Sequence, residues 1–405
     1  MSPFEPSSAS PTGSPTGSPT VAVVGSGPSG CYTAQFLRKQ WREAEITVFD
    51  RLDLPYGLVR YGVAPDHQGT KAVAKQFDRL FERDGVRFAG GVQIGTDITL
   101  EALRESFDVV VLATGLSADR PLDGEGAGLA GVYGAGALTR LINGHPDEVA
   151  DTLVLGQTVT IVGHGNVAFD LVRLFLTPAS ELLALGVDTE VVAAIGRGPV
   201  TRIELVGRSA APLAKFDVAM AKELGKLPDV RFEAEGLDIA VTEGQGDEAR
   251  REAIDGLVSG SPASAGRSVH VRFGWSPSRV RGDGAVEGID FVAADGSGAV
   301  LTLSTDSVCT AIGFSESETS AIRRGDHEGP TSDLARGVLD TGLYVVGWLR
   351  RGPQGTIPAN RTDSKMVAET IIHDVTSGDL VVGKPGYSAV ETALNDPAAS
   401  LSTLI

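Results

Sequence analysis

Two stretches of the chain share one hydrophobic pattern, in which a short apolar run ends at a glycine-rich turn and a longer run follows. The first is VAVVGSGPSGCYTAQFL (residues 21–37), and the second is TVTIVGHGNVAFDLVRLFL (residues 158–176). A short apolar run that stops at glycine favours a buried strand, and the longer run after it favours a helix. The pattern therefore predicts the same strand–turn–helix unit twice, with the first strand over residues 21–25 and the first helix over 28–40.

Other apolar runs continue an alternation of strands and helices. Strands are predicted at EITVFDR, FDVVVLATG, TRIELVGR and DSVCTAIGF, which span residues 45–51, 107–115, 201–208 and 306–314. A helix is predicted over 71–83, and the block 342–372 predicts a strand, a glycine-rich loop and a helix. Irregular, connecting or exposed structure is predicted for 54–71, 116–156 and 240–268. This alternation favours an α/β protein.

The two turns carry the residues that a pyrophosphate-binding loop needs. Their three key positions are Gly25, Gly27 and Gly30 in the first turn and Gly163, Gly165 and Ala168 in the second. In such a loop the first glycine makes the turn, the second lets the backbone approach the phosphates, and the third position must be small for close helix–strand packing. Two loops of this Rossmann-like kind predict two dinucleotides in one protein, which exchange electrons.

An acidic residue narrows the choice of the first nucleotide. Asp50 ends the predicted strand that follows the first turn. An acid at this place accepts hydrogen bonds from ribose hydroxyls, and it would repel a phosphate on that ribose. The first nucleotide is therefore predicted to be FAD or NAD rather than NADP.

Length and composition add limits on the number of domains, the partners and the location of the protein. A length of 405 residues suffices for two domains, and a net charge of −17 argues against nucleic acid as a partner. No apolar run approaches the roughly 20 residues of a membrane span. Residues 1–20, rich in Ser, Pro, Thr and Gly, predict a disordered tail. The two cysteines, Cys31 and Cys309, are far apart, so neither a metal site nor a redox disulfide is predicted, and isolated thiols fit a cytoplasmic location.

Several motifs, taken together, are more specific than either loop alone. They are GSGPSG with Asp50, GLVRYGVAPDH at 57–67, ATG at 113–115, GHGNVAFD, VRFGWSPSRV at 271–280, GWLRRGPQGTI and PGYSAVETAL at 385–394. In this order they resemble the adrenodoxin reductase-type ferredoxin–NADP reductases, from about residue 20 to about residue 395. The resemblance implies an α/β fold of two Rossmann-like dinucleotide-binding domains, one inserted into the other. The FAD-binding domain would be 21–115 with 335–405, and the NAD(P)-binding domain 116–334.

The resemblance also implies which residues bind the two dinucleotides. For FAD they are Gly25, Gly27, Ser29, Gly30, Asp50, Leu58, Val92, Trp348, Gly355, Thr356 and Ile357. For the nicotinamide dinucleotide they are Gly163, His164, Gly165, Asn166, Val167, Arg208 and Gly355. His67 and Glu223 match residues that lie near the flavin and nicotinamide in the family. On the residues alone, His67 is equally well a loop histidine that orders its segment, and Glu223 a solvated helix residue.

The chain departs from the family pattern where the coenzyme phosphate is expected. The family usually has two adjacent arginines for the 2′-phosphate of NADPH, whereas this chain has Arg208 followed by Ser209. Met220 replaces a family acid, and Lys215 is a nearby basic residue that could compensate. One guanidinium fewer removes a charge-assisted contact of roughly 1.5–3 kcal/mol. NADP(H) is therefore predicted to be favoured only weakly, with NAD(H) as a possible substitute.

The function implied by the resemblance is electron transfer from NAD(P)H through FAD to a ferredoxin-type iron–sulfur protein. Hydride transfer to flavin N5 would precede single-electron transfers. Two alternatives stay open: a flavoprotein reductase with a quinone, oxygen or another small acceptor, and a cofactor-binding protein without turnover. Arg350, Arg351 and Arg361 surround the loop expected at the flavin. They predict either a basic docking face for an acidic acceptor or structural and cofactor-binding roles.

Overall fold

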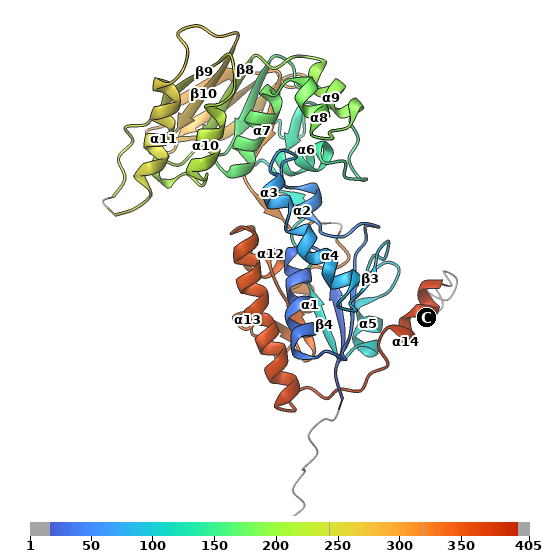
Figure 1. The fold of residues 1–405 in the computed structure, drawn as a ribbon. Coiled ribbons are helices and arrows are strands. Elements are labelled where there is room, and N and C mark those ends of the chain that lie inside the picture. Colours follow the sequence, from blue (N-terminus) through green and yellow to red (C-terminus); the bar gives the residue numbers. More distant parts are fainter. Residues whose placement is uncertain (1–16, 243, 319, 396–405) are drawn as a thin grey trace, which may run out of the picture. The chain divides into compact units, whose positions relative to one another are not determined.

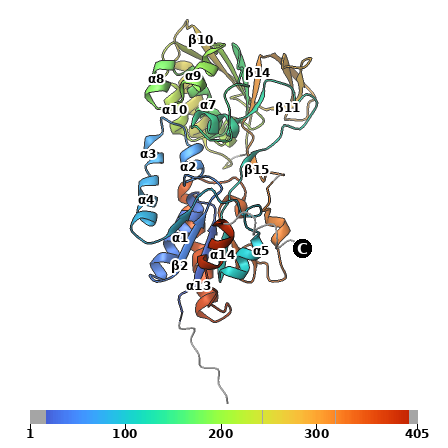
Figure 2. The same cartoon turned by 90° about the vertical axis from the view of Figure 1, so that its right-hand side faces the viewer.

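The computed structural model describes residues 17–242, 244–318 and 320–395. The chain divides into two compact units (Figure 1; Figure 2 gives the view turned by 90°). The first unit comprises Met1–Gly57, Val73–Leu116 and Glu316–Ile405, and the second comprises Leu58–Ala72 and Ser117–Ser315. The second unit is therefore inserted in the first along the chain.

The first unit is built on a six-stranded sheet in the order β16-β17-β4-β1-β2-β3. Its strands are β1 (Thr20–Val24), β2 (Glu45–Phe49), β3 (Arg87–Ala89), β4 (Val109–Leu112), β16 (Val338–Asp340) and β17 (Leu343–Val345). All neighbouring strands are parallel except β16 and β17. Its helices are α1 (Pro28–Gln40), α4 (Ala74–Glu82), α5 (Leu100–Ser106), α12 (Trp348–Arg351), α13 (Ile357–Thr376) and α14 (Tyr387–Asn395), with the 3₁₀ turn η2 (Arg324–His327). Helix α13 lies along α1 (Figure 1).

The second unit contains another six-stranded sheet, in the order β6-β14-β7-β8-β10-β9. Its strands are β6 (Val132–Gly134), β7 (Thr158–Val162), β8 (Arg202–Gly207), β9 (Val230–Glu235), β10 (Arg267–Phe273) and β14 (Ser307–Thr310). The longer helices are α6 (Ala135–Ile142), α7 (Asn166–Leu176), α9 (Thr189–Gly196), α10 (Val218–Leu224) and α11 (Glu248–Ser259). The shorter ones are α2 (Leu58–Tyr61), α3 (Gln68–Lys71), α8 (Ala179–Ala184) and η1 (Ala211–Leu213).

Two smaller sheets complete the second unit. The strands β11 (Trp275–Arg281), β12 (Gly288–Ala293) and β13 (Val300–Ser304) form an antiparallel sheet, and β5 (Ala118–Asp119) pairs with β15 (Phe314–Ser315). Ile289 and Phe291 of β12 pack with Val162 and Val206 of the large sheet. The opposite face of the large sheet packs on α7, α10 and α11, which Figure 1 shows side by side. Both faces are therefore covered, as a parallel sheet requires.

The predicted α/β fold of two Rossmann-like units, one within the other, is confirmed. Within the described residues, no helix is both long and apolar enough to cross a membrane. Three segments expected to be irregular contain regular elements: 54–71 holds α2 and α3, 116–156 holds β5, β6 and α6, and 240–268 holds α11. Helix α11 was not predicted because only two of its residues, Ile254 and Leu257, are buried, so its sequence has few apolar positions that mark a helix.

The unit boundaries differ from the expected domain boundaries at three places. Residues 58–72 lie with the second unit, because this segment bonds to α7 and α10. Residues 316–334 lie with the first unit, where Arg324 donates to the carbonyl oxygens of Leu349 and Arg350. Thr20 belongs to β1 rather than to the predicted tail, since Asp108 accepts a hydrogen bond from its backbone N–H. Residues 1–16 of that tail and residues 396–405 at the end of the chain lie outside the described residues.

Candidate functional site: two glycine loops

The first glycine loop joins the central strand β1 to helix α1. Gly25 has φ of +108°, and a Cβ there would stand 2.5 Å from the carbonyl oxygen of Ala113. A Cβ at Gly30 would overlap the carbonyl oxygen of Gly25. A Cβ at Gly27, in contrast, would meet no atom of the described chain within 4 Å. Two glycines thus allow close packing, and the third borders open space at the first turn of a helix, where backbone N–H groups bind anions.

Asp50 ties this loop to β2. One carboxylate oxygen accepts hydrogen bonds from the backbone N–H of Ser26, at 2.8 Å, and from its hydroxyl. The other accepts from the backbone N–H of Leu52 at 3.0 Å. The backbone of Val92 reaches the same strand end, because its N–H donates to the carbonyl oxygen of Asp50. Asp50 therefore holds the loop in shape.

The C-terminal part of the chain contributes to the same end of the sheet. Gly347 has φ of +74°, and a Cβ there would overlap the hydroxyl of Ser29 in α1. Ser364 of α13 donates to the carbonyl oxygen of Ser29 at 3.0 Å. Trp348 follows Gly347, while Thr356 is the N-cap of α13. The first unit thus carries every predicted FAD residue except Leu58, which begins α2 in the second unit.

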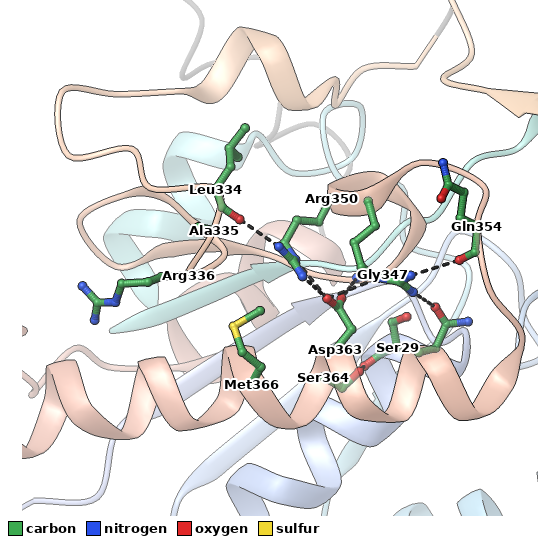
Figure 3. Close-up of polar contacts among 12 residues, drawn as sticks. Ser29, Leu334, Ala335, Arg336, Gly347, Arg350, Gln354, Asp363, Ser364 and Met366 are labelled. Carbon is green, nitrogen blue, oxygen red and sulfur yellow. Dashed lines mark hydrogen bonds and ion pairs between the residues drawn. The ribbon is translucent and has the colours of Figure 1, made fainter. Parts of the chain in front are cut away.

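The three arginines near this loop differ in their surroundings. Arg350 and Arg351 both contact the carboxylate of Asp363. Figure 3 shows the contact of Arg350. Arg361 is exposed, and its guanidinium lies 5.9 Å from the ring centre of Phe36. For Arg350 and Arg351, the structure supports the structural role over the predicted docking role.

The second glycine loop joins β7 to α7 and repeats the geometry of the first. Gly163 has φ of +121°, and a Cβ there would overlap the carbonyl oxygen of Ala311. Around Gly165, the N-cap of α7, a Cβ would find no described atom within 4 Å. The side chain of Asn166 bonds to both the carboxylate and the backbone N–H of Asp217, at 2.7 Å each. This loop therefore also presents a helix N-terminus to open space, with Val167 in its first turn.

His164 points into the protein rather than toward a ligand. Its ring packs on Gly207 and lies 4.6 Å from the ring centre of Phe273. Burial lowers the pKa of His164 to about 4, although a bond to the carbonyl oxygen of Leu205 opposes this shift. Because that carbonyl accepts, Nε2 carries the proton and Nδ1 is an acceptor. The ring of His164 is therefore held by contacts within the protein.

The buried imidazole predicts a pH-dependent stability. The folded pKa lies below the ordinary value of 6.5, so the unfolded chain binds a proton more readily. The contribution of His164 to the free energy of unfolding is therefore complete above pH 6.5. It should fall by about 3 kcal/mol as the pH falls toward 4. Denaturant unfolding of the wild type and of His164→Asn, compared at pH 7 and pH 4, should show this loss in the wild type only. Equal losses in both proteins would contradict the assignment.

The residues expected at the coenzyme phosphate lie beyond the end of β8. Arg208 is exposed, Ser209 is partly buried, and Lys215 is exposed. The backbone N–H of Lys215 donates to the carbonyl oxygen of His164 at 3.1 Å, so this lysine lies beside the second glycine loop. Met220 is buried in the core of the second unit. The position where the resemblance implied an acid thus holds a packing residue.

The two predicted polar residues, His67 and Glu223, meet within the second unit. Nε2 of His67 lies 3.1 Å from the carboxylate of Glu223, and Nδ1 lies 3.8 Å from the carboxylate of Asp170. Arg173 donates to Asp66 at 2.5 and 2.9 Å and to Asp170 at 2.6 Å. His67 is therefore more than an isolated loop histidine, because it belongs to a cluster of five ionisable residues.

The electrostatics of this cluster depend on Arg173. Burial would raise the pKa of Asp66, but hydrogen bonds and charge from Arg173 outweigh it and lower that pKa. At Asp170 burial prevails, so its pKa is raised despite Arg173. Sequence reasoning missed all three residues. The available signal was the spacing of Asp170 and Arg173, three apart on one helix face.

The cysteines are buried one in each unit, Cys31 and Cys309. Burial raises the pKa of both thiols. Both are therefore poor nucleophiles, and neither is placed for thiol–disulfide chemistry.

Comparison with known proteins finds oxidoreductases, as expected for a chain with two glycine loops of this kind. The sequence profile of the pyridine nucleotide-disulphide oxidoreductase family matches residues 19–243. A cindoxin reductase of Citrobacter braakii is 46% identical over 380 residues, which cover 93% of this chain and 82% of that protein. The chain belongs to the adrenodoxin reductase type of this oxidoreductase family. The resemblance inferred from the sequence motifs is thus confirmed.

Two further relatives extend the comparison. The mitochondrial NADPH:adrenodoxin oxidoreductase of Arabidopsis thaliana is 30% identical, with 90% of this chain and 84% of that protein covered. The solved structure of Mycobacterium tuberculosis FprA in complex with NADPH superposes with a TM-score of 0.82 at 28% identity, covering 92% of this chain and 89% of FprA. The likeness to family members therefore spans both units.

Proposed function

We propose that this protein is an FAD-dependent reductase that passes electrons from NADPH to a ferredoxin-type iron–sulfur protein. The observation that carries the proposal is the pair of glycine loops, one per unit, each bordering open space at Gly27 or Gly165. The names of the relatives support it, since they are reductases of cindoxin and adrenodoxin and one structure holds NADPH. Two buried, unpaired cysteines fit a cytoplasmic location, which we propose as well.

The open space at Gly27 is what a bound pyrophosphate would require, so the residues of the first unit fit FAD. The first turn of α1, with Ser29 and Gly30, would bind the pyrophosphate, and Asp50 would accept from a ribose. The rest of the FAD molecule would contact Val92, Trp348, Gly355, Thr356 and Ile357. Leu58 is the remaining residue that the resemblance assigns to FAD. Bound FAD would take two electrons from NADPH and release them singly, as a one-electron acceptor needs.

The residues of the second unit fit a nicotinamide dinucleotide in the same way. Gly163, Gly165, Asn166 and Val167, with the backbone of His164, would bind its pyrophosphate at the start of α7. Arg208 would attract the 2′-phosphate of NADPH, and Gly355 is the remaining residue that the resemblance assigns to this coenzyme. His67 and Glu223 are proposed to contact the coenzyme, with Nε2 of His67 lying 3.1 Å from the Glu223 carboxylate.

The decisive experiment is spectroscopic. The purified protein should show a flavin absorbance spectrum with one FAD per chain, and NADPH should bleach it without oxygen. Adding an acidic ferredoxin should then restore the oxidised spectrum. A protein that takes up no FAD would contradict the proposal. Rapid turnover with quinones but none with ferredoxins would favour the alternative of a small electron acceptor.

The missing second arginine predicts weak discrimination between coenzymes. Ser209→Arg should add one charge-assisted phosphate contact, which raises the preference for NADPH over NADH by about 10- to 150-fold. The constants for NADH should change little, because NADH lacks that phosphate. Steady-state kinetics with both coenzymes, and with Ser209→Gln as the uncharged control, would measure this. If the wild type already prefers NADPH by several thousandfold, another basic group performs the role.

A further inference from the structure

One carboxylate organises the loop between β17 and α13. The side chain of Asp363, in the second turn of α13, is only 2% exposed. It accepts a hydrogen bond from the backbone N–H of Gly347 at 2.6 Å. It also accepts from Nε of Arg350 at 3.0 Å and contacts Nε of Arg351 at 3.2 Å (Figure 3). Two guanidinium groups and the start of the loop therefore converge on a single buried acid.

The two arginines extend these contacts to both ends of the loop. Arg350 donates from Nη1 to the carbonyl oxygen of Leu334 at 2.9 Å. Arg351 donates from Nη2 to the side-chain oxygen of Asn360 at 2.7 Å and from Nη1 to the carbonyl oxygen of Gln354 at 3.0 Å. The segment from Gly347 to Gln354 is thus tied to α13 and to the preceding turn, as Figure 3 shows.

The tied segment lies beside residues that would contact the flavin. Gly347 packs on the hydroxyl of Ser29, so the segment touches the helix of the first glycine loop. A Cβ at Gly355 would stand 3.6 Å from Nη1 of Arg351. Because Gly355 precedes the N-cap of α13, Arg351 lies next to the start of that helix.

The charges of this cluster do not cancel. Two guanidinium groups against one carboxylate leave one positive charge. The first turn of α13 contains no acidic residue, and its N-cap, Thr356, makes no side-chain capping bond. The partial positive charge of the helix N-terminus therefore adds to the cluster. Positive charge near the flavin ring makes reduction easier, since reduction adds negative charge to the ring.

We infer that Asp363 is a positioning residue that holds Arg351 at the flavin-binding loop and limits the positive charge presented there. In this way it sets the reduction potential of the bound flavin. The inference rests on the proposed function and deepens it, because it concerns how the same FAD site is tuned. It also gives the Arg350–Arg351 pair a role other than partner docking.

The test is the midpoint potential of the bound flavin, measured by equilibration with a reference dye. Arg351→Gln removes a positive charge and should lower the potential. Asp363→Asn keeps a side-chain oxygen that can accept from the guanidinium groups but removes the negative charge, so it should raise the potential. A tenfold change in the reduction equilibrium, which is about 30 mV for a two-electron couple, is the expected size of each shift. Arg351→Lys should stay near the wild-type potential because it keeps the positive charge. It should bind FAD more weakly, because lysine cannot bond to Asp363, Asn360 and Gln354 together and so holds the loop less firmly.

Arg336→Gln is the matched control. Arg336 lies in the neighbouring turn and pairs with Asp374, away from Asp363 (Figure 3). Its loss should leave the potential unchanged. Shifts in the same direction for Asp363→Asn and Arg351→Gln, or no shift in either, would overturn the inference. If Asp363→Asn does not fold, the comparison of Arg351→Gln with Arg351→Lys decides, because only the first loses charge. A wild type that binds no FAD would instead refute the proposed function.

Discussion

Replacing Gly27 by valine should give a folded protein that no longer retains FAD. The new side chain would extend into the space proposed for the pyrophosphate and meet no protein atom within 4 Å at its Cβ in the described structure. The backbone at Gly27 has φ of −65° and ψ of 177°, which any residue adopts, so the fold itself should tolerate the change. Loss of two phosphate hydrogen bonds would cost about 3–6 kcal/mol, or on the order of 10²- to 10⁴-fold in affinity.

The second glycine loop supplies the matched variant. Gly165 has a similar extended backbone, with φ of −94° and ψ of 172°. Gly165→Val should therefore keep its FAD and its yellow colour but lose NADPH binding by a comparable factor. Flavin absorbance after desalting and calorimetric titration with NADPH would separate the two effects. Should Gly165→Val lose FAD and Gly27→Val keep it, the assignment of dinucleotides to the two units is reversed.

The glycine loops could be predicted from the sequence because their signals are local. At Gly25 and Gly163 a positive φ, a preceding apolar strand and a following helix all lie within one short stretch. The geometry that makes these glycines necessary is the close approach of Ala113 or Ala311, which directly follow the adjacent strands β4 and β14. That approach follows from the parallel order of the sheet, which the alternation of strands and helices already indicates.

Other features depend on contacts between residues far apart in the sequence. The segment 58–72 lies with the second unit because Asp66 and His67 bond to α7 and α10, more than a hundred residues later. Likewise, the sequence does not reveal which way a side chain points. His164 looks like a loop residue that meets a ligand, but its ring fills the space above Gly207. Arg351 looks like an exposed cation, but Asp363 and Asn360 bind it.

Removing Arg173 should destabilise the second unit by about 3–5 kcal/mol, because Arg173→Met leaves two carboxylates partly buried without their cation. The Arg173 side chain is only 7% exposed, and it bonds to both Asp66 and Asp170. Asp66 lies in the segment 58–72, so this segment should also detach from α7. Hydrogen exchange measured by mass spectrometry should show faster exchange in peptides from 58–72, with little change in peptides from β1 and α1.

Two comparisons separate this effect from a general loss of stability. Arg231→Met removes an arginine that is 48% exposed and pairs with Glu233 on the same unit, and it should cost no more than about 1 kcal/mol. Adding Asp66→Asn and Asp170→Asn to Arg173→Met should recover much of the loss, since the neutral amides no longer need a cation. If Arg173→Met unfolds at the wild-type urea midpoint, or if the triple variant is less stable than the single one, the uncompensated carboxylates are not the cause. The segment 58–72 would then be attached to the second unit mainly by the remaining contacts, among them the hydrogen bond from Lys71 to Asn143.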